Sequence, residues 1–120
     1  RGGRQIFGPV TLLDLPVTVG ERMGWSGMPA DGGLSLAETA RTRQVPRQRA
    51  IFIETSQPRA SSTRAVVTWP WKLMMHQEKG QVGLWLSHLG YDPGESRNLT
   101  GQQPAIAQEL ERVARQWWGM

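Results

Sequence analysis

The sequence predicts an α+β domain in which a small antiparallel sheet of three to four strands packs against a C-terminal amphipathic helix. Two observations predict this fold class. Between residues 49 and 88, segments rich in β-branched and aromatic residues alternate with turn signals, as in consecutive strands. Farther along, apolar residues recur at spacings of four, three and four, which is the spacing of one stripe on a helix. These residues are Ile106, Leu110, Val113 and Trp117.

The expected strands are bounded by residues that favour turns. They cover about 49–55, 63–69, 71–77 and 82–88. Pro58 and the small residues that follow it mark the loop between the first two strands. The last two strands are predicted to form a hairpin around Lys79 and Gly80.

The register of this hairpin follows from its turn. On one face the expected pairs are Leu73 with Leu86, Met75 with Leu84, and Gln77 with Val82. On the other face they are Lys72 with Ser87 and Met74 with Trp85. One face is therefore an apolar ladder, and its burial under the C-terminal helix, at about 25 cal/mol per Å² of apolar area, is expected to be the main stabilising term.

The C-terminal helix is expected at about 103–118, because Pro104 suits its first turn and Gly119 ends it. Its apolar stripe needs a partner surface, which the sheet provides. Of the six tryptophans, we expect Trp69, Trp85 and Trp117 in the core, and Trp25, Trp71 and Trp118 on surface that other protein covers.

The first 48 residues have a different character. A short helix is expected at about 16–24, opening near Pro16 and closing near Gly24, and 24–35 has the composition of a loop. The segment contains too little periodic apolar sequence for a core of its own. We therefore expect it to lean on the sheet domain or on protein outside this chain.

The composition is that of a globular protein, with 38% hydrophobic and 20% charged residues. The absence of cysteine excludes disulfides, thiolate metal sites and thiol nucleophiles. No apolar run approaches the roughly 20 residues that a membrane helix needs, so no membrane segment is expected in this chain.

The net charge of +4 comes from twelve arginines and two lysines against ten carboxylates, which raises the question of a nucleic-acid partner. The densest basic run contains no aromatic residue that could stack on a base, and Pro46 would break a helix there. This run consists of Arg41, Arg43, Arg47 and Arg49. We interpret it as a solvated loop and expect no nucleic-acid partner.

Four segments carry a more specific pattern, and two of them lie in the first 48 residues. In GPVTLLDLPVTVGERMGW, at 8–25, the residues Asp14, Leu15, Pro16 and Thr18 open a helix that ends in Gly24. The second segment is ADGGLSL at 30–36, which follows the expected helix.

The other two segments lie in the expected sheet domain. In the third, Arg64-Ala65-Val66-Val67-Thr68 is followed by Trp71-Lys72-Leu73. In the fourth, Asp92-Pro93-Gly94-Glu95 is followed by Asn98-Leu99 and then by a helix that starts at a proline and ends in tryptophan.

Taken in order, the four segments resemble the end of the sulfatase family, within the alkaline-phosphatase superfamily, over about residues 4–118. The resemblance implies that 1–48 is the tail end of the catalytic α/β domain of a longer enzyme and that 49–120 is its C-terminal subdomain. It implies a parent hydrolase of sulfate esters, or of phosphate or phosphonate esters, that is periplasmic or secreted.

The catalytic residues of this family lie upstream of such segments. By resemblance, the parent enzyme uses a formylglycine, made from the first residue of a Cys/Ser-x-Pro-x-Arg motif, and a calcium ion. The nearest stretch here is Ser56 to Ala60, where Arg59 falls one position early. The chain is therefore expected to carry no catalytic residue, metal or cofactor, to complete the fold and edge the substrate cleft, and to be inactive alone.

The expected partners are the missing catalytic domain and, in the intact enzyme, a sulfate-ester substrate, with self-association through the exposed docking surface as a further expectation. Within loop 55–63, Arg59 is the candidate for touching substrate. The remaining motif residues are expected to be structural. They are Asp14, Pro16, Thr18, Arg64, Lys72, Asp92, Pro93, Glu95 and Asn98.

Two sets of residues admit a catalytic or metal-binding interpretation. His76 and His88 fall at opposite ends of the hairpin, so ordinary strand histidines are favoured over a metal site. Asp92 and Glu95 are close enough for an acid-base pair or a calcium site. The Asp-Pro-Gly-Glu sequence instead favours a turn in which Asp92 and Asn98 satisfy local backbone amides.

Two alternatives to the sulfatase interpretation remain. One is a free-standing basic module that binds an anionic polymer, which predicts salt-sensitive binding. The other is a non-catalytic relative that retains this subdomain as an interaction surface.

Overall fold

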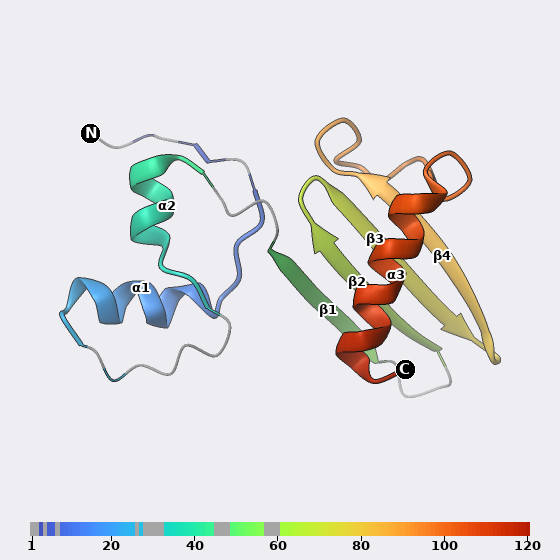
Figure 1. Cartoon of the computed structure of the whole chain (residues 1–120), viewed down its shortest axis with the longest axis horizontal. Helices are drawn as coiled ribbons and strands as arrows, with labels where there is room; N and C mark the ends of the chain where they lie inside the picture. The colour runs from blue at the N-terminus through green and yellow to red at the C-terminus, as the bar shows by residue number, and fades with distance from the viewer. Residues whose placement is uncertain are drawn as a thin grey trace. The chain divides into compact units, whose positions relative to one another are not determined.

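The structure is a computed structural model that describes residues 3, 5, 6, 8–25, 27, 33–44, 49–56 and 61–120. The chain divides into two compact units, Arg1–Pro46 and Arg47–Met120. Figure 1 shows two short helices in the first unit and a sheet with one helix in the second.

The second unit contains a four-stranded antiparallel sheet in the order β1-β2-β3-β4. Its strands are β1 (Ala50–Ser56), β2 (Ser61–Thr68), β3 (Trp71–Glu78) and β4 (Gln81–His88). The helix α3 (Pro104–Trp118) lies across one face of the sheet (Figure 1). The predicted α+β fold class is confirmed.

The register of the β3–β4 hairpin is also confirmed, with Leu73 opposite Leu86 and Met74 opposite Trp85. Lys79 and Gly80 form the turn with φ values of 50° and 81°. Positive φ at both central residues is the geometry of the tight hairpin turn whose twist matches that of the flanking strands. The turn therefore fixes the face on which every side chain of the hairpin lies.

The core lies between the sheet and α3. Val66, Leu73 and Leu86 are fully buried, one from each of three neighbouring strands, and Met75 is nearly so. The helix contributes the buried residues Ala107, Leu110 and Ala114.

The buried stripe of α3 is centred differently from the prediction. Trp117, expected in the core, is 65% exposed and stacks flat on Phe52, with ring centroids 4.3 Å apart. Trp118, expected on the surface, packs against the core and meets Phe52 edge to face. Small side chains let a helix approach a sheet closely, so Ala107 and Ala114 face the sheet. With these residues facing the sheet, Trp117 points outward.

The face of the sheet opposite α3, called here the second face, carries the side chains that alternate with the core residues. Ala65 and Val67 are buried on it, whereas Ile53 and Trp85 are 43% and 37% exposed. The prediction of Trp85 in the core is therefore wrong. The prediction of Trp71 on the surface is also wrong, because this half-buried residue packs against the core cluster.

The first unit contains α1 (Asp14–Arg22) and α2 (Leu36–Thr42). The predicted helix at 16–24 thus begins and ends two residues earlier. Gly24 lies beyond the helix with a φ of 69°, in the left-handed region that favours glycine. At the other end, the Asp14 carboxylate accepts a hydrogen bond from the Thr11 backbone N–H, so the chain turns before Pro16.

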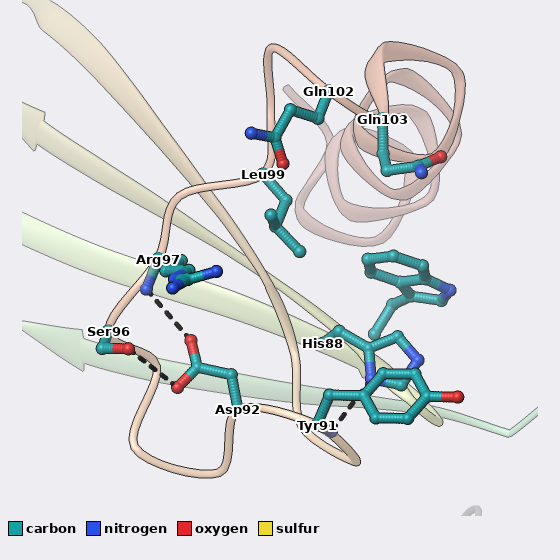
Figure 2. Close-up of a pocket in the computed structure, with 9 residues that line it drawn as sticks. His88, Tyr91, Asp92, Ser96, Arg97, Leu99, Gln102 and Gln103 are labelled. Carbon is teal, nitrogen blue, oxygen red and sulfur yellow. Dashed lines mark hydrogen bonds between the residues drawn. The ribbon is translucent and has the colours of Figure 1, made fainter.

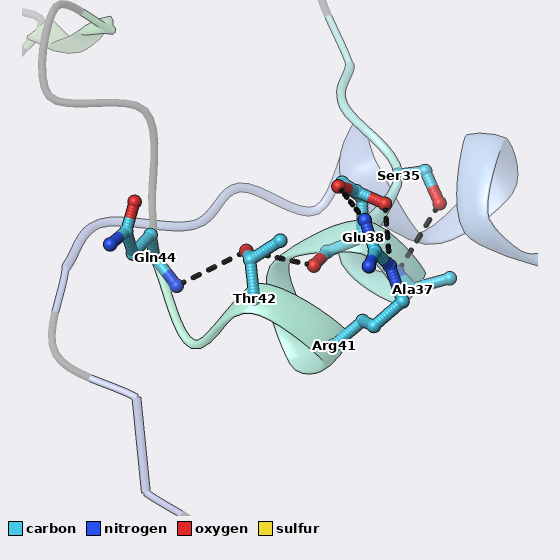
Figure 3. A network of polar contacts seen from close by, with 6 residues as sticks. All are labelled: Ser35, Ala37, Glu38, Arg41, Thr42 and Gln44. Atoms are coloured by element: carbon cyan, nitrogen blue, oxygen red, sulfur yellow. Dashed lines mark hydrogen bonds and ion pairs between the residues drawn. The ribbon is translucent and has the colours of Figure 1, made fainter.

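The helix α2 was not predicted, and its presence corrects the interpretation of Arg41 as part of a loop. Ser35 caps it by accepting the Ala37 backbone N–H at 3.2 Å. Arg41 pairs with Glu38 one turn earlier at 2.6 Å, and the Thr42 hydroxyl donates to the Glu38 carbonyl (Figure 3). A helix of seven residues that is stabilised by its cap and one ion pair is too short to show a long apolar stripe. The search for periodic apolar residues therefore did not predict it.

In the part of the chain that the structure describes, no helix is both long and apolar enough to cross a membrane.

Candidate functional site

A cavity of about 730 Å³ opens at one end of the sheet in the second unit. Three parts of the chain line it: the facing ends of β3 and β4, the loop that follows β4, and the start of α3. Figure 2 shows its lining residues, with His88 and Tyr91 on one side, Arg97 across from them, and Gln102 and Gln103 at the start of α3.

Three aromatic rings form one wall of this cavity. Trp71 meets His88 edge to face at 4.7 Å, and Tyr91 stacks on the other side of His88 with centroids 4.3 Å apart. The Tyr91 backbone N–H donates to His88 Nδ1 at 3.2 Å, so the proton of the neutral imidazole lies on Nε2. The hydrogen bond and the stacking fix the Tyr91 ring although its side chain is highly exposed.

Asp92 forms the turn that borders the cavity. Its carboxylate accepts the Ser96 hydroxyl and the Arg97 backbone N–H, each at 3.0 Å. Hydrogen bonding from the Ser96 backbone, supported by the Arg97 backbone, the Ser96 hydroxyl and the Arg97 charge, holds the pKa of Asp92 below its ordinary value. The predicted hydrogen bond between Asp92 and a local backbone amide is confirmed by the bond from the Arg97 backbone N–H.

Glu95 is engaged elsewhere and does not join Asp92 as an acid-base pair. Both of its carboxylate oxygens accept from Lys72 Nζ, at 2.6 and 2.9 Å, and both side chains are mostly buried. Glu95 adopts a φ of 54°, which turns the loop toward the second face, where Lys72 lies. The sequence singled out both residues, but no sequence signal paired them across 23 positions.

Asn98 joins the same loop to the outer edge of β4. Its Oδ1 accepts the backbone N–H of Leu86 and of Thr100, both at 3.1 Å, and its Nδ2 donates to the Leu84 carbonyl at 3.0 Å. The bond to Thr100 is the local amide contact that was predicted. The two bonds to β4 were not predicted, because they depend on the loop returning to the strand.

Arg64 lies on the helix-facing side of the sheet. It donates to Glu54 at 2.8 Å and to the Met120 sulfur at 3.0 Å, and its guanidinium lies 5.4 Å from the ring centroid of Trp118. These contacts join β1, β2 and the end of α3.

The candidate residues of the first unit form a polar link between α1 and the segment before α2. Asp14 is fully buried, and its Oδ1 accepts the Leu34 backbone N–H at 2.8 Å. The Thr18 hydroxyl donates to the Asp14 carbonyl and accepts the Leu36 backbone N–H. Pro16 is exposed in the first turn of α1.

Arg59 lies outside the described residues, and Pro93 is exposed in the turn. His76 pairs with Gly83 and His88 with Trp71, at opposite ends of the hairpin as predicted. Among the described residues, no group of three histidines or carboxylates lies close enough to hold a metal ion.

Sequence reasoning missed five residues that line the cavity: Tyr91, Ser96, Arg97, Gln102 and Gln103. None of them belongs to a motif. The signal that could have found them is their position, since all lie between the end of the last strand and the first turn of the terminal helix.

The solved structures that share this fold include two sulfatases. One is yidJ of Bacteroides fragilis, assigned as a sulfatase, with 20% identity, a TM-score of 0.67, and coverage of 87% of this chain and 23% of that one. The second is a sulfatase of Bacteroides thetaiotaomicron from a locus for the metabolism of multiple glycosaminoglycans, with 17% identity, a TM-score of 0.61, and coverage of 89% and 24%. The chain has the fold of part of a sulfatase.

The predicted resemblance to sulfatases is therefore confirmed at the level of the fold. The chain spans about a quarter of the length of these two sulfatases. No protein-family model matches the sequence, and no curated protein matches it significantly.

Proposed function

We propose that this chain is the C-terminal subdomain of a sulfatase-type hydrolase, together with the segment that leads into it. The observation that supports this most strongly is the coverage of the fold match, which takes in 87% of the chain but only 23% of a sulfatase. Nearly the whole chain thus corresponds to a minor part of an enzyme of this kind.

The subdomain supplies structure, and the chemistry belongs to the upstream protein. In the parent enzyme, a formylglycine and a calcium ion would supply the nucleophile and the charge stabilisation for ester hydrolysis. The carboxylates that could have acted here have other partners: Asp92 holds its own turn and Glu95 pairs with Lys72. We assign no residue of this chain to hold either group.

The second face of the sheet is the proposed docking surface for the catalytic domain. Its apolar side chains are those of Ile51, Ile53, Ala65, Val67, Met74 and Trp85. Ile53 and Trp85 are exposed although they continue an otherwise buried apolar row. Exposed apolar groups that adjoin one another are typical of a surface that another protein covers.

The proposal is tested by the coding sequence upstream of Arg1 and by the activity of the longer protein. An in-frame Cys/Ser-x-Pro-x-Arg motif is expected there, and the longer protein should hydrolyse an aryl sulfate while residues 1–120 alone should not. Turnover by the 120-residue chain, or a start codon directly before Arg1, would contradict the proposal.

The alternative of a basic module for an anionic polymer is weakened by ion pairing. Four arginines pair with glutamates at 2.6 to 2.8 Å, which leaves less positive charge for a polymer. They are Arg41, Arg64, Arg112 and Arg115. Retention of the chain on heparin that disappears with moderate salt would favour the alternative.

A further inference from the structure

The cavity beside α3 has a wall that is apolar, flat and preorganised. The Tyr91 ring is 88% exposed, yet it stacks on His88 at an interplanar angle of 23° and its backbone is bonded to the same imidazole. An exposed aromatic ring held in one orientation loses little conformational entropy when a ligand stacks on it.

The remaining lining is polar and has hydrogen-bonding capacity to spare. Among the described residues, the Arg97 guanidinium and the side-chain amides of Gln102 and Gln103 make no hydrogen bond or ion pair with one another or with other side chains. The guanidinium offers only donors, whereas each amide offers both donors and an acceptor. Asp92 adds acceptor capacity, because an ionised carboxylate has about four acceptor sites and the bonds from Ser96 and Arg97 do not occupy all of them.

This combination restricts the chemistry of the ligand. A flat aromatic wall suits a molecule with an apolar face of C–H groups, and mixed donors and acceptors suit a ring of hydroxyls. The single free cation, Arg97, suits one anionic substituent, but the nearby Asp92 charge makes a small anion alone a poor ligand. A cavity of about 730 Å³ falls in the range of small-molecule sites.

We propose that this cavity binds a sugar ring of a sulfated glycan, with the ring against Tyr91, its hydroxyls on Gln102, Gln103 and Asp92, and its sulfate on Arg97. The ring is a unit of the substrate remote from the bond that reacts, because the proposed nucleophile lies in the protein upstream of this chain. The identification of this glycan as substrate rests on the proposed function, but the binding itself does not.

Trp71 in the same wall provides a direct reporter. In a ¹H–¹⁵N spectrum of the 120-residue chain, its indole N–H signal is assigned with Trp71→Phe and followed during titration with three probes: a sulfated hexosamine, the same hexosamine without sulfate, and inorganic sulfate. We expect saturable shifts with both sugars, stronger binding of the sulfated one, and no saturable shift with sulfate.

Variants separate the two parts of the site. Tyr91→Ala should weaken both sugars about tenfold, which corresponds to about 1.4 kcal/mol. Arg97→Gln should weaken only the sulfated sugar, whereas the matched control Arg112→Gln, elsewhere on the surface, should change neither. Tyr91→Phe should retain most of the binding, because the stacking face remains.

Three results would overturn the inference: no shift with either sugar at tens of millimolar, equal shifts with inorganic sulfate, or sugar binding that Tyr91→Ala leaves unchanged. These outcomes are independent of the proposed function. A longer protein that hydrolyses sulfate esters while the cavity binds no sugar refutes the inference alone, and sugar binding without hydrolysis refutes the proposed function alone.

Discussion

At the scale of single residues, the loop between β4 and α3 is organised by three polar side chains with different tasks. Asp92 closes the turn, Glu95 reaches Lys72 on the second face, and Asn98 bonds to the outer edge of β4. Each satisfies groups that would otherwise be unpaired, which is where a polar side chain contributes most to stability. We therefore propose that the Asp-Pro-Gly-Glu and Asn-Leu pattern serves to shape this loop.

The lowered pKa of Asp92 predicts a pH dependence of stability. Because the pKa of Asp92 is lower in the folded chain than in the unfolded chain, the contribution is fully present above the ordinary value of 3.8 and is lost as the pH falls through the folded pKa. Urea unfolding at pH 7 should therefore show the wild type to be more stable than Asp92→Asn.

The difference between the two proteins should shrink as the pH is lowered below about 4, because the wild-type carboxyl then becomes protonated. Glu109→Gln, which removes another carboxylate with a lowered pKa but on the exposed surface of α3, controls for the change in net charge. A stability difference for Asp92→Asn that is the same at pH 7 and pH 3 would contradict the assignment.

At the scale of elements, the packing of α3 depends on its small residues. Ala107 and Ala114 contact the sheet, and the two terminal tryptophans divide their roles around Phe52. Trp118 closes the core and lies under the Arg64 guanidinium, whereas Trp117 covers Phe52 from outside.

Substituting the two tryptophans one at a time tests this division. Trp118→Ala should lower the free energy of unfolding by about 3 kcal/mol, because it leaves a cavity at the core. Trp117→Ala should lower it by only about 1 kcal/mol, the order of one aromatic pair. Chemical denaturation of the two variants measures both values. A larger loss of unfolding free energy for Trp117→Ala than for Trp118→Ala would contradict this division and would favour the predicted position of Trp117 in the core.

The elements that could be predicted from the sequence are those for which the turn or capping residues and the pattern of apolar residues indicate the same structure. The β3–β4 register follows from one turn and the alternation of side chains, and the extent of α3 follows from Pro104 and Gly119. The rotation of α3 about its own axis could not be predicted. The prediction followed the spacing of the large apolar residues, whereas close approach to a sheet favours small residues such as alanine on the buried side. For the helix α2, a serine cap and one ion pair are too weak a signal.

The candidate site could be predicted only in part, because it depends on contacts between distant positions. The Asp92 turn is local and was predictable. The cavity brings Trp71 close to Gln103, and the Lys72–Glu95 ion pair joins two residues that lie far apart in the sequence. Only the path of the loop after β4 brings these residues together, and that path is set by Asn98 and by the positive φ of Glu95.

At the scale of the whole molecule, the sheet has two unequal faces. One is buried under α3, and the second face leaves Ile53 and Trp85 exposed. If the proposed catalytic domain covers the second face in the longer protein, the chain alone should be prone to self-association.

We expect the isolated chain to self-associate through the second face, and Ile53→Gln combined with Trp85→Gln to shift it toward monomer. The control is Met23→Gln, which removes an even more exposed apolar side chain from the first unit. Sedimentation velocity over a range of concentrations measures the shift. If the control reduces association as much as the double variant, the second face is not the surface involved.

The bonds that Asn98 makes to β4 also limit how such chains could aggregate. Leu84 and Leu86 carry outward backbone groups that the next strand of a growing sheet would need, and Asn98 and the Leu99 N–H already occupy them. In the described part of the chain, no loop is bonded in this way along β1. Pairing between two copies at β1 would therefore close on itself, so that edge-to-edge growth stops at two molecules and cannot continue into a fibre.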